Sequence, residues 1–423
     1  RYIQHNPHVP NGKAPFVNYF TQYFKENPQA RNTIKSVIAE GDRVVLHVHS
    51  TQNNQDRGTA IVDIFRVENG KIVAVGQDLP CGNEVLCFSD KSYVLVPSFT
   101  DLHTHFRDPG FTYKEDLETG SRAALHGGYT AVNLMPNTRP ICCTLDRVKE
   151  VESRAQALDL ITVNQTLSMT KDLAGEEFSH LATLEKQEVL FVTDDGKGVN
   201  NDEVMKHIFE ICRDREITIM QHAEDSRFSK TDMREAENRM TFRDIELFSK
   251  IGGHLHFCHV STKEAIAAIA QAQAQGMNVT CEVTPHHLFS TGDEAAHYRV
   301  NPPLRERDDI DALISAIQQD VVCAIATDHA PHSDEDKANG SPGMIGIEQA
   351  FALCYTSLVK SGKINLQKLI SIMSTQPSQM MKLNKGKIAV GLDADFAIVE
   401  IDISYILSRE DILSKSKNTP FIG

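Results

Sequence analysis

The chain of 423 residues lacks any run of about 18 consecutive apolar residues, the length that a membrane-spanning helix requires. Its first residues also lack the basic-then-apolar pattern of a secretory signal. Clusters of lysine and arginine are missing too, and the formal net charge is −14. We therefore expect neither a membrane nor a nucleic acid as partner, and an anionic small substrate would need local cations to hold it.

The nine cysteines lack the CxxC spacing of a redox motif or a zinc finger. Several lie within apolar segments, as the buried reduced thiols of a cytoplasmic protein do. We therefore predict a cytoplasmic location. The sequence also begins with Arg1 rather than methionine and stops at Gly423, so we expect one or both ends to be trimmed.

Apolar strand-like segments alternate with longer helical stretches from residue 93 onward, at a spacing of roughly 23 to 43 residues, the length of one strand–helix unit. Their near-continuous apolar character is typical of a parallel sheet that is covered on both faces. Eight such units predict the α/β class and, within it, a (β/α)8 barrel. The predicted strands are residues 93–101, 129–135, 160–167, 189–194, 217–222, 255–260, 278–284 and 321–327.

The segments on either side of the predicted barrel have other patterns. Residues 16–24 predict a helix with an aromatic face, and residues 43–51 and 59–67 alternate as antiparallel strands do. Glu68-Asn-Gly predicts a hairpin turn, and a further sheet-like segment follows at residues 387–399. We therefore expect a small β domain made from both flanking segments.

The most informative motif is His103-x-His105, with Arg107 two residues further on, at the end of the first predicted strand. Because alternate residues of a strand share a face, two imidazoles and a cation lie on one side of it. The carboxyl ends of the strands carry the chemistry of such barrels. This pattern indicates a metal centre beside an anionic substrate.

Four more residues of metal-ligand type lie at or just past the ends of other predicted strands, namely Asp195, His222, His259 and Asp328. Zinc binds imidazole nitrogen and carboxylate oxygen readily. Together with the two histidines of the motif they make six ligands. Such a set suffices for two metal ions that share a bridging carboxylate and a bridging water.

Simpler explanations exist for several other residues. A second HxH motif, at residues 47–49, has no carboxylate in a matching frame, and an ordinary half-buried strand explains it. Packing explains His286 and His287 better than metal binding does. For Arg107, a surface salt bridge with Asp108 is the alternative to binding an anion.

Seven motifs jointly resemble the dihydroorotases of the amidohydrolase superfamily, over residues 68–423. The resemblance is to the bacterial type whose bridging ligand is an aspartate. Hydantoinase-like relatives carry a carboxylated lysine in the fourth strand, whereas this strand has no lysine and Lys197 lies beyond its glycine. The motifs are residues 103–110 (HTHFRDPG), 133–137 (NLMPN), 193–196 (TDDG), 221–225 (QHAED), 258–262 (CHVST), 300–305 (VNPPLR) and 326–332 (ATDHAPH).

The resemblance implies two zinc ions per chain. One would be held by His103, His105 and Asp328, and the other by His222 and His259. Asp195 and a hydroxide would bridge the two ions, with Asp194 as the adjacent alternative to Asp195. The residues implied in substrate binding are Arg107, Asn137, Asn301 and His332.

The implied reaction is the reversible hydrolysis of (S)-dihydroorotate to N-carbamoyl-L-aspartate, a step of de novo pyrimidine synthesis. The bridging hydroxide would attack the ring amide, and Asp328 would act as general acid and base. The alternatives are a cyclic amidase of hydantoinase or allantoinase type, and an inactive homologue that serves as a scaffold for aspartate transcarbamoylase. The resemblance is compatible with a homodimer and with that association.

Residues 1–75 resemble a different family, the SnoaL-like proteins of the nuclear-transport-factor-2-like fold, without that fold's first helices and final strands. We therefore expect a fusion near residues 67–76, where both resemblances overlap. Residues 43–51 or 59–67 would then replace a strand that the β-sandwich of dihydroorotases otherwise has. The expected domains are the α+β fragment 1–66, a partial β-sandwich of 67–98 with 386–423, and the barrel 99–385.

Overall fold

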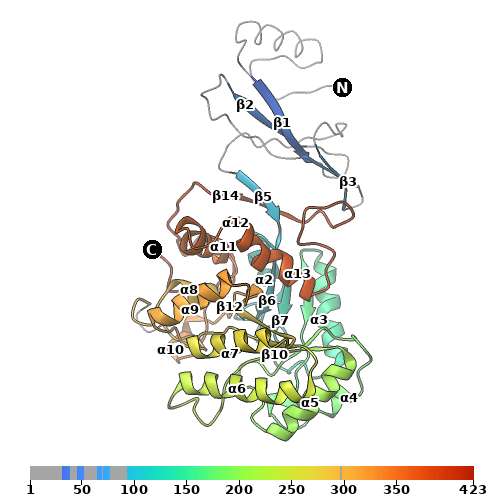
Figure 1. The fold of residues 1–423 in the computed structure, drawn as a ribbon, viewed down its shortest axis with the longest axis vertical. Coiled ribbons are helices and arrows are strands. Elements are labelled where there is room, and N and C mark those ends of the chain that lie inside the picture. The colour runs from blue at the N-terminus through green and yellow to red at the C-terminus, as the bar shows by residue number, and fades with distance from the viewer. Residues whose placement is uncertain (1–30, 39–44, 52–63, 69, 77–92, 296–297) are drawn as a thin grey trace. The chain divides into compact units, whose positions relative to one another are not determined.

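The computed structural model describes residues 31–38, 45–51, 64–68, 70–76, 93–295 and 298–423 (Figure 1). The chain divides into two compact units. One comprises Arg1–Val96 with Lys387–Ser404, and the other comprises Pro97–Gly386 with Tyr405–Gly423. The helix predicted at residues 16–24 lies outside the described residues.

Parallel strands form the centre of the larger unit. Parallel bridges between Leu167 and Val192 and between Thr104 and His329 connect its two sheets at both edges. This arrangement confirms the predicted α/β barrel fold. The first sheet has the order β6 (Phe99–Thr104), β7 (Tyr129–Leu134) and β8 (Thr162–Gln165), and the second the order β9 (Phe191–Val192), β10 (Thr218–Gln221), β11 (Leu255–Phe257), β12 (Val279–Val283) and β13 (Ala324–Ile325).

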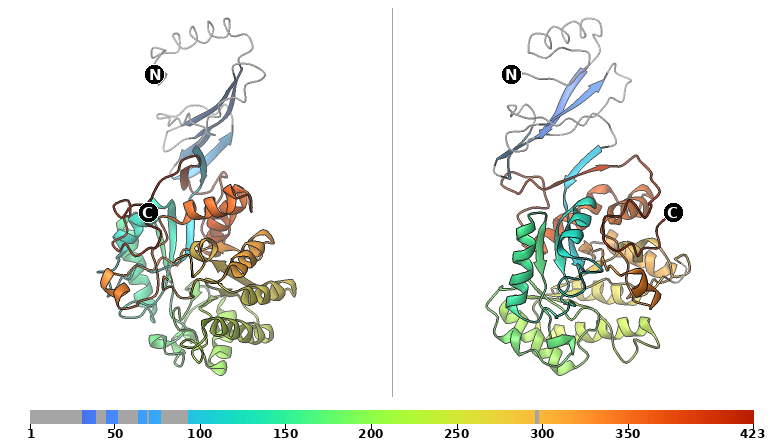
Figure 2. Two further views of the ribbon diagram at one scale, coloured as in Figure 1. Left: turned by 90° about the vertical axis from the view of Figure 1, so that its left-hand side faces the viewer. Right: turned by 180° about the vertical axis from the view of Figure 1, so that it is seen from behind.

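Helices follow the strands along the chain and surround them (Figures 1 and 2). None of the helices in the described parts of the chain combines the length and the apolar character needed to cross a membrane. The longer helices are α2 (Leu117–His126), α3 (Leu145–Leu158), α5 (Asp202–Arg215), α6 (Met233–Ile251), α7 (Lys263–Ala274) and α9 (Arg307–Gln318). Shorter ones are η1 (Lys171–Leu173), α4 (Ser179–Ala182), α8 (Pro285–Phe289), α10 (Asp334–Ala338), α11 (Ala350–Cys354) continuing as η2 (Tyr355–Lys360), and α12 (Leu366–Ile370) continuing through η3 (Ser371–Thr375) into α13 (Gln376–Met380).

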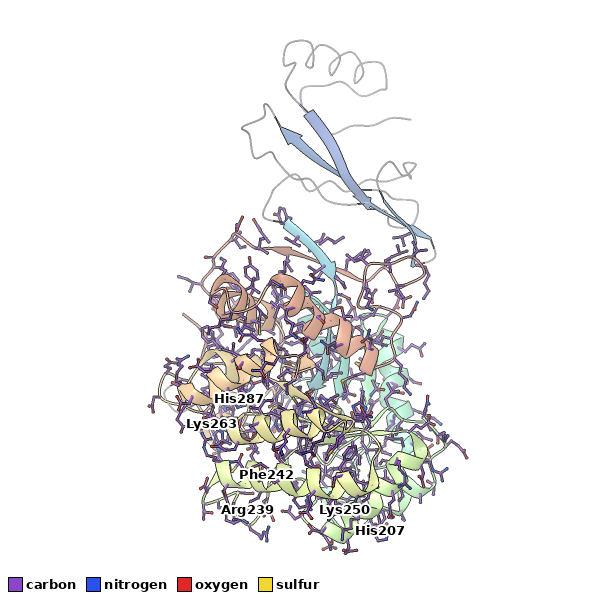
Figure 3. All side chains as sticks on the ribbon, in the orientation of Figure 1. His207, Arg239, Phe242, Lys250, Lys263 and His287 are labelled. Carbon is purple, nitrogen blue, oxygen red and sulfur yellow. The ribbon has the colours of Figure 1, made fainter. Side chains whose placement is uncertain are left out.

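Helix α6 illustrates how sequence periodicity sets a helix against the strands. Its buried positions, among them Ala236 and Met240, recur at helical spacing. The side chains of Arg239, Phe242 and Lys250 are exposed and project from the opposite face (Figure 3). The helix begins at Asp232, whose side chain accepts hydrogen bonds from two backbone amides.

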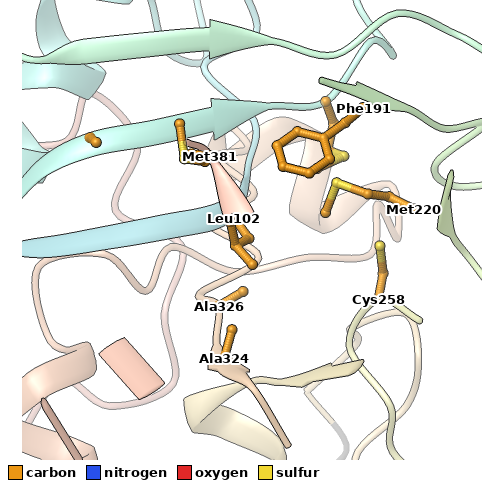
Figure 4. Close-up of a cluster of buried hydrophobic side chains, with 9 residues drawn as sticks. Leu102, Phe191, Met220, Cys258, Ala324, Ala326 and Met381 are labelled. Atoms are coloured by element: carbon orange, nitrogen blue, oxygen red, sulfur yellow. The ribbon is translucent and has the colours of Figure 1, made fainter. Parts of the chain in front are cut away.

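An apolar cluster joins side chains from several barrel strands (Figure 4). Such a cluster excludes water and fixes the strand ends that follow it. Its buried members are Leu102, Ala131, Met135, Phe191, Met220, Cys258, Ala324, Ala326 and Met381.

Gly120 in α2 leaves room for the ring of Phe106, since a Cβ at Gly120 would lie 2.6 Å from ring atoms. A Gly120→Ala substitution favours the helix by up to ~1 kcal/mol, but forced overpacking costs ~1–3 kcal/mol. We therefore expect the variant to unfold at lower urea concentration than the wild type. A Phe106→Leu substitution in the same chain should recover part of the loss, and simple addition of the two single effects would contradict this explanation.

The prediction of a single strand over residues 93–101 is wrong. The segment divides at Ser98 into β5 (Tyr93–Pro97) and β6, and β5 pairs with β14 (Phe396–Glu400) in the smaller unit. Pro97 has no backbone N–H to continue a ladder. The Ser98 carbonyl accepts instead from the Ser374 hydroxyl at 2.6 Å. The other seven predicted strands each overlap an observed one.

Beside β5 and β14, the described part of the smaller unit has two antiparallel strand pairs. β1 (Arg31–Ile38), which the sequence did not predict, pairs with β2 (Val45–Thr51), and β3 (Ile64–Glu68) pairs with β4 (Lys71–Gly76). The predicted hairpin turn is confirmed, because Glu68 lies opposite Lys71 and Gly70 has a φ of 72°. The second HxH motif lies in β2, as predicted.

Segments from both flanks of the barrel meet in this unit. The backbone of Ile72 donates to the Leu392 carbonyl and accepts from the Gly391 amide, at 2.9 and 2.7 Å. The buried Ile72 side chain packs against Leu95 and Phe396. Because Ile64–Glu68 pairs with Lys71–Gly76, the described part of the predicted strand 59–67 is not detached from β4. The replacement of a sandwich strand stays a prediction, as do the domain boundaries.

Candidate metal centre

Six ionisable side chains converge at the carboxyl ends of the barrel strands. The residues are those that the sequence analysis selected, and all six are buried. Their positions follow from the strands: a side chain just past a parallel strand faces the same end of the barrel as its neighbours do. They are His103 and His105 at β6, Asp195 after β9, His222 after β10, His259 after β11 and Asp328 after β13.

The Asp195 carboxylate lies between four imidazoles. Its Oδ1 is 3.3 Å from His103 Nε2, 3.4 Å from His222 Nδ1 and 3.7 Å from His259 Nε2. Its Oδ2 is 3.6 Å from His105 Nε2. Burial acts to raise the pKa of Asp195, but the charge of His103, with the nearby imidazoles of His222 and His259, lowers it well below its usual range. The carboxylate is therefore an anion.

Asp328 closes the other side of the cluster. Its Oδ1 lies 3.0 Å from His105 Nε2 and 3.6 Å from His103 Nε2. Burial again acts to raise the pKa, and the neighbouring imidazoles, His105 first, lower it far below the usual value for aspartate. A second anion thus stands across the histidines from Asp195.

These distances fit divalent metal ions. Ligands placed 2.0–2.1 Å from a tetrahedral zinc ion lie about 3.3 Å from one another, close to the spacings in this cluster. Among the described residues, His103 Nε2 has no hydrogen-bond partner although it is buried. The Nδ1 atom of His222 and the Nε2 atom of His259 approach to 2.9 Å. Cations held by these nitrogens and two carboxylates would satisfy them all.

Three site residues have left-handed backbone conformations. The φ angles are 60° at Arg107, 35° at His259 and 47° at Asp328. Residues other than glycine rarely adopt such angles, and each costs on the order of 1–3 kcal/mol. The surrounding barrel therefore holds these three side chains in positions that the local sequence disfavours.

Asp194, the adjacent alternative to Asp195, points elsewhere. Its Oδ1 accepts from the Thr170 amide at 2.9 Å, and its Oδ2 accepts from the Thr170 hydroxyl. Asp194 thus ties the strand end to the loop after β8. Of the two neighbouring carboxylates, Asp195 is the one that faces the imidazoles.

Glu282, in β12, orients His103 from behind. Its Oε1 is 2.8 Å from His103 Nδ1, and its Oε2 is 3.0 Å from His256 Nε2. A carboxylate that accepts from Nδ1–H leaves the Nε2 lone pair free for a metal. The sequence analysis missed Glu282 and His256. An ionisable residue inside a short apolar strand was the signal that could have identified them.

A Glu282→Gln variant should bind metal about 10–100-fold more weakly, since the charge that supports the His103 ligand is lost. Titration of the metal-free protein with Co²⁺ against a chelating indicator measures this. Glu237→Gln is the matched control, because Glu237 is an equally buried carboxylate whose partners are Arg305 and Ser261. Equal Co²⁺ affinity of the Glu282 variant and the wild type would contradict the orienting role.

The four predicted substrate residues lie around the cluster in two pairs. The Arg107 guanidinium donates to the Pro331 carbonyl at 3.2 Å and lies 3.3 Å from His332 Nε2. Burial lowers the pKa of Arg107 to about 10, so it remains a cation at neutral pH. Asp108 forms an ion pair with Arg154 at 2.7 Å. The alternative explanation of Arg107, a surface salt bridge with Asp108, is therefore wrong.

Asn137 contacts two of the six ligands directly, and Asn301 is connected to a third through Glu224. Asn137 Oδ1 lies 2.9 Å from His105 Nδ1, and Asn137 Nδ2 donates to Asp195 at 3.0 Å. Asn301 donates to Glu224 at 2.9 Å, and Glu224 lies 2.9 Å from His222 Nε2. Both amides therefore help to orient residues of the cluster.

His286 and His287 lie in the interior near the site. Both are buried, and His287 bonds through its two nitrogens to the Thr284 hydroxyl at 2.8 Å and the Pro302 carbonyl at 3.0 Å. These contacts agree with the predicted packing role.

Residues 414–418 fasten two of the site's loops. The Ser414 hydroxyl and the Lys415 amide donate to Glu115, in the loop after β6. The Asn418 side chain accepts from the His332 amide at 3.0 Å and donates to the Gly343 carbonyl at 3.3 Å, in the segment after β13.

Two family models match the sequence. The Amidohydrolase family model matches residues 94–421, and the SnoaL-like domain model matches residues 1–75. Both resemblances drawn from the motifs are thereby confirmed.

Curated relatives are similar over most of their length. A protein named dihydroorotase from Clostridium botulinum is 46% identical over 363 residues, covering 85% of this chain and 90% of the relative. Another protein named dihydroorotase, from Elusimicrobium minutum, is 37% identical over 402 residues, covering 89% and 92%.

Solved structures share the fold at lower identity. L-hydantoinase from Arthrobacter aurescens has a TM-score of 0.74 at 24% identity and covers 86% of this chain and 89% of its own. A dihydropyrimidinase from Brevibacillus agri has a TM-score of 0.72 at 23% identity and covers 93% and 91%. At this identity the likeness concerns the fold alone.

Proposed function

The chain belongs to the amidohydrolase family and is a cyclic amide hydrolase, and from this premise we propose that it interconverts dihydroorotate and N-carbamoyl-aspartate. The observation that carries the proposal is the partly buried Arg107 guanidinium beside His332, two residues beyond the His103–His105 pair. Dihydroorotate differs from the simple cyclic amides by a carboxylate on its ring. A buried arginine binds a carboxylate through two parallel hydrogen bonds, so it selects for that group.

Zinc is the metal that the donor set fits, two ions per chain. His103, His105 and Asp328 would hold one ion, His222 and His259 the other, and Asp195 both. Such ions supply polarisation of the amide carbonyl and a water of lowered pKa. The six side chains come from the ends of five barrel strands, which supports a rigid site.

Asp328 is the proposed general acid and base. Its carboxylate is held by His105 through one oxygen at 3.0 Å, which leaves the second oxygen for proton transfer. In the hydrolytic direction it would take a proton from the attacking water and deliver it to the ring nitrogen that leaves. Arg107, Asn301 and His332 would meanwhile fix the ring, with Asn137 near the metal ligands.

The hydantoinase or allantoinase reading is less well supported. The Lys197 side chain is exposed, so the lysine that follows the fourth strand does not face the histidines. Arg107 would have no anion to bind on a simple hydantoin ring. An inactive scaffold is also less well supported, because all six ionisable residues converge. A step in pyrimidine synthesis, a cytoplasmic location, a homodimer and association with aspartate transcarbamoylase remain parts of the proposal.

Metal analysis and turnover of the purified chain test the proposal together. We expect two zinc ions per chain and hydrolysis of dihydroorotate that greatly exceeds hydrolysis of hydantoin and allantoin. Preferred hydrolysis of hydantoin or allantoin would favour the cyclic amidase alternative. Two bound metal ions without turnover of any of the three substrates would favour the scaffold.

A further inference from the structure

Lys114 lies in the loop between β6 and α2. It is next to His332, which together with Arg107 is proposed to bind the substrate carboxylate. Its Nζ is 3.2 Å from His332 Nδ1 and 3.3 Å from Asp336 Oδ1. Only 11% of the side chain is exposed. The rings of Phe111 and Tyr113 flank the ammonium, at 5.4 and 5.5 Å.

The imidazole of His332 thus lies between two cations. Burial, and then the charges of Arg107 and Lys114, lower the pKa of His332 to about 3, with Lys337 adding to this effect and Asp336 opposing it. The ring is therefore neutral at physiological pH, with one N–H and one acceptor nitrogen. Arg107 and Lys114 can only donate. One of the two must face the nitrogen that carries the proton.

The anchoring of the two cations decides which nitrogen that is. Lys114 is held towards Nδ1 by Asp336, whose other oxygen accepts from the Ser333 amide and hydroxyl at 3.1 and 2.7 Å. The Arg107 guanidinium is fixed through its Nε to the Pro331 carbonyl, and its Nη2 stays 3.3 Å from Nε2. This anchoring favours the Lys114 contact as the hydrogen bond, with Nδ1 as the acceptor and the proton on Nε2.

Two donors then stand side by side with no acceptor between them. The Nε2–H of His332 and the Nη2–H of Arg107 are 3.3 Å apart at heavy atoms. Such an arrangement is unfavourable by itself, and a carboxylate that accepts from both relieves it. The backbone of His332 is held in place, because its amide donates a hydrogen bond to the Asn418 side chain.

We propose that Lys114 is a positioning residue of this anion site: by donating to Nδ1 of His332 it holds the ring as the Nε2–H tautomer and aims that N–H, beside Arg107, at the substrate carboxylate. This inference rests on the proposed function, and it assigns Lys114 an effect on substrate affinity that is exerted through His332.

The test is a double-mutant cycle on dihydroorotate hydrolysis, with Lys114→Met, His332→Ala and the double variant. We expect Lys114→Met to raise KM about tenfold with little change in kcat, since one oriented hydrogen bond is lost. In the His332→Ala background the same substitution should add little, because Lys114 acts through that ring. Lys114→Arg, which keeps a donor, should recover part of the affinity. Calorimetric titration with orotate, which carries the same carboxylate, should repeat the pattern without turnover.

Lys415→Met is the matched control. The Lys415 side chain donates to the Thr112 carbonyl and to Asp116, both in the loop that carries Lys114, and neither contact involves His332. A rise in KM from Lys415→Met equal to that from Lys114→Met would mean that the loop, not the tautomer, matters, and would overturn the inference. Additive effects of Lys114→Met and His332→Ala would overturn it as well. Absence of turnover in the wild type would overturn the proposed function and this inference together, whereas turnover with additive effects overturns the inference alone.

Discussion

An Asp328→Asn variant should lose at least about 10³-fold in kcat for dihydroorotate, with a much smaller change in KM. The amide side chain preserves the size of the carboxylate and an oxygen that can face His105, but it cannot take up the proton that the reaction releases. The measurement is steady-state hydrolysis by the wild type and by the variant, each saturated with zinc beforehand. The bound metal is determined on the same samples. Retained metal with lost turnover would separate proton transfer from metal binding.

Asp244→Asn is a suitable control for the Asp328 variant. Asp244 is a fully buried carboxylate of the same unit, and it accepts from Gln221 at 2.6 Å and contacts Arg243. Its amide variant should be less stable and yet turn over dihydroorotate within a few-fold of the wild type. A kcat of the Asp328 variant within tenfold of the wild type would rule out its role as general acid and base.

An Arg107→Met variant should lower kcat/KM for dihydroorotate by about 10³-fold, because removal of one partner from a buried charge pair costs about 2–5 kcal/mol. The same variant should change hydrolysis of dihydrouracil, which has no carboxylate, by only a few-fold. Rates for both substrates, measured on one preparation, give the ratio directly. Position 107 has a φ of 60°, and arginine and methionine are both non-glycine residues. The substitution therefore adds no new backbone strain at this position.

Arg107→Lys distinguishes charge from geometry. Lysine keeps the positive charge but lacks the planar fork, so we expect it to recover only a part of the lost kcat/KM. An equal loss on dihydroorotate and dihydrouracil in the methionine variant would contradict recognition of the carboxylate by Arg107.

The barrel was predictable because its strands are apolar on both faces and are separated by helices of regular length. The failures have local physical causes. The segment 93–101 reads as one apolar run, and only the pairing of β5 with β14 and of β6 with β7 divides it. β9 and β13 are two residues long, so their observed ends depend on neighbouring strands rather than on their own sequence.

The candidate site was predictable where residue type and position coincide. His103 lies near the end of β6, Asp195 and Asp328 follow β9 and β13, and parallel strands bring their carboxyl ends together. Glu282 and Lys114 could not be found in this way. Their contacts with His103 and His332 join residues 179 and 218 positions apart, and such pairing appears only after the chain has folded.

The fastening of the loops by residues 414–418 has a consequence for the order of folding. Ser414 and Glu115 are 299 residues apart, and Asn418 and His332 are 86 apart. A ribosome adds roughly 5–20 residues per second, so the strands of the barrel emerge well before their fastener does. The histidine and aspartate cluster can therefore assemble on the growing chain, whereas the loops that carry Lys114 and His332 gain their fixed positions only after residues 414–418 have emerged. The proposed recognition of the substrate carboxylate is thus expected to mature after the cluster of metal ligands has formed.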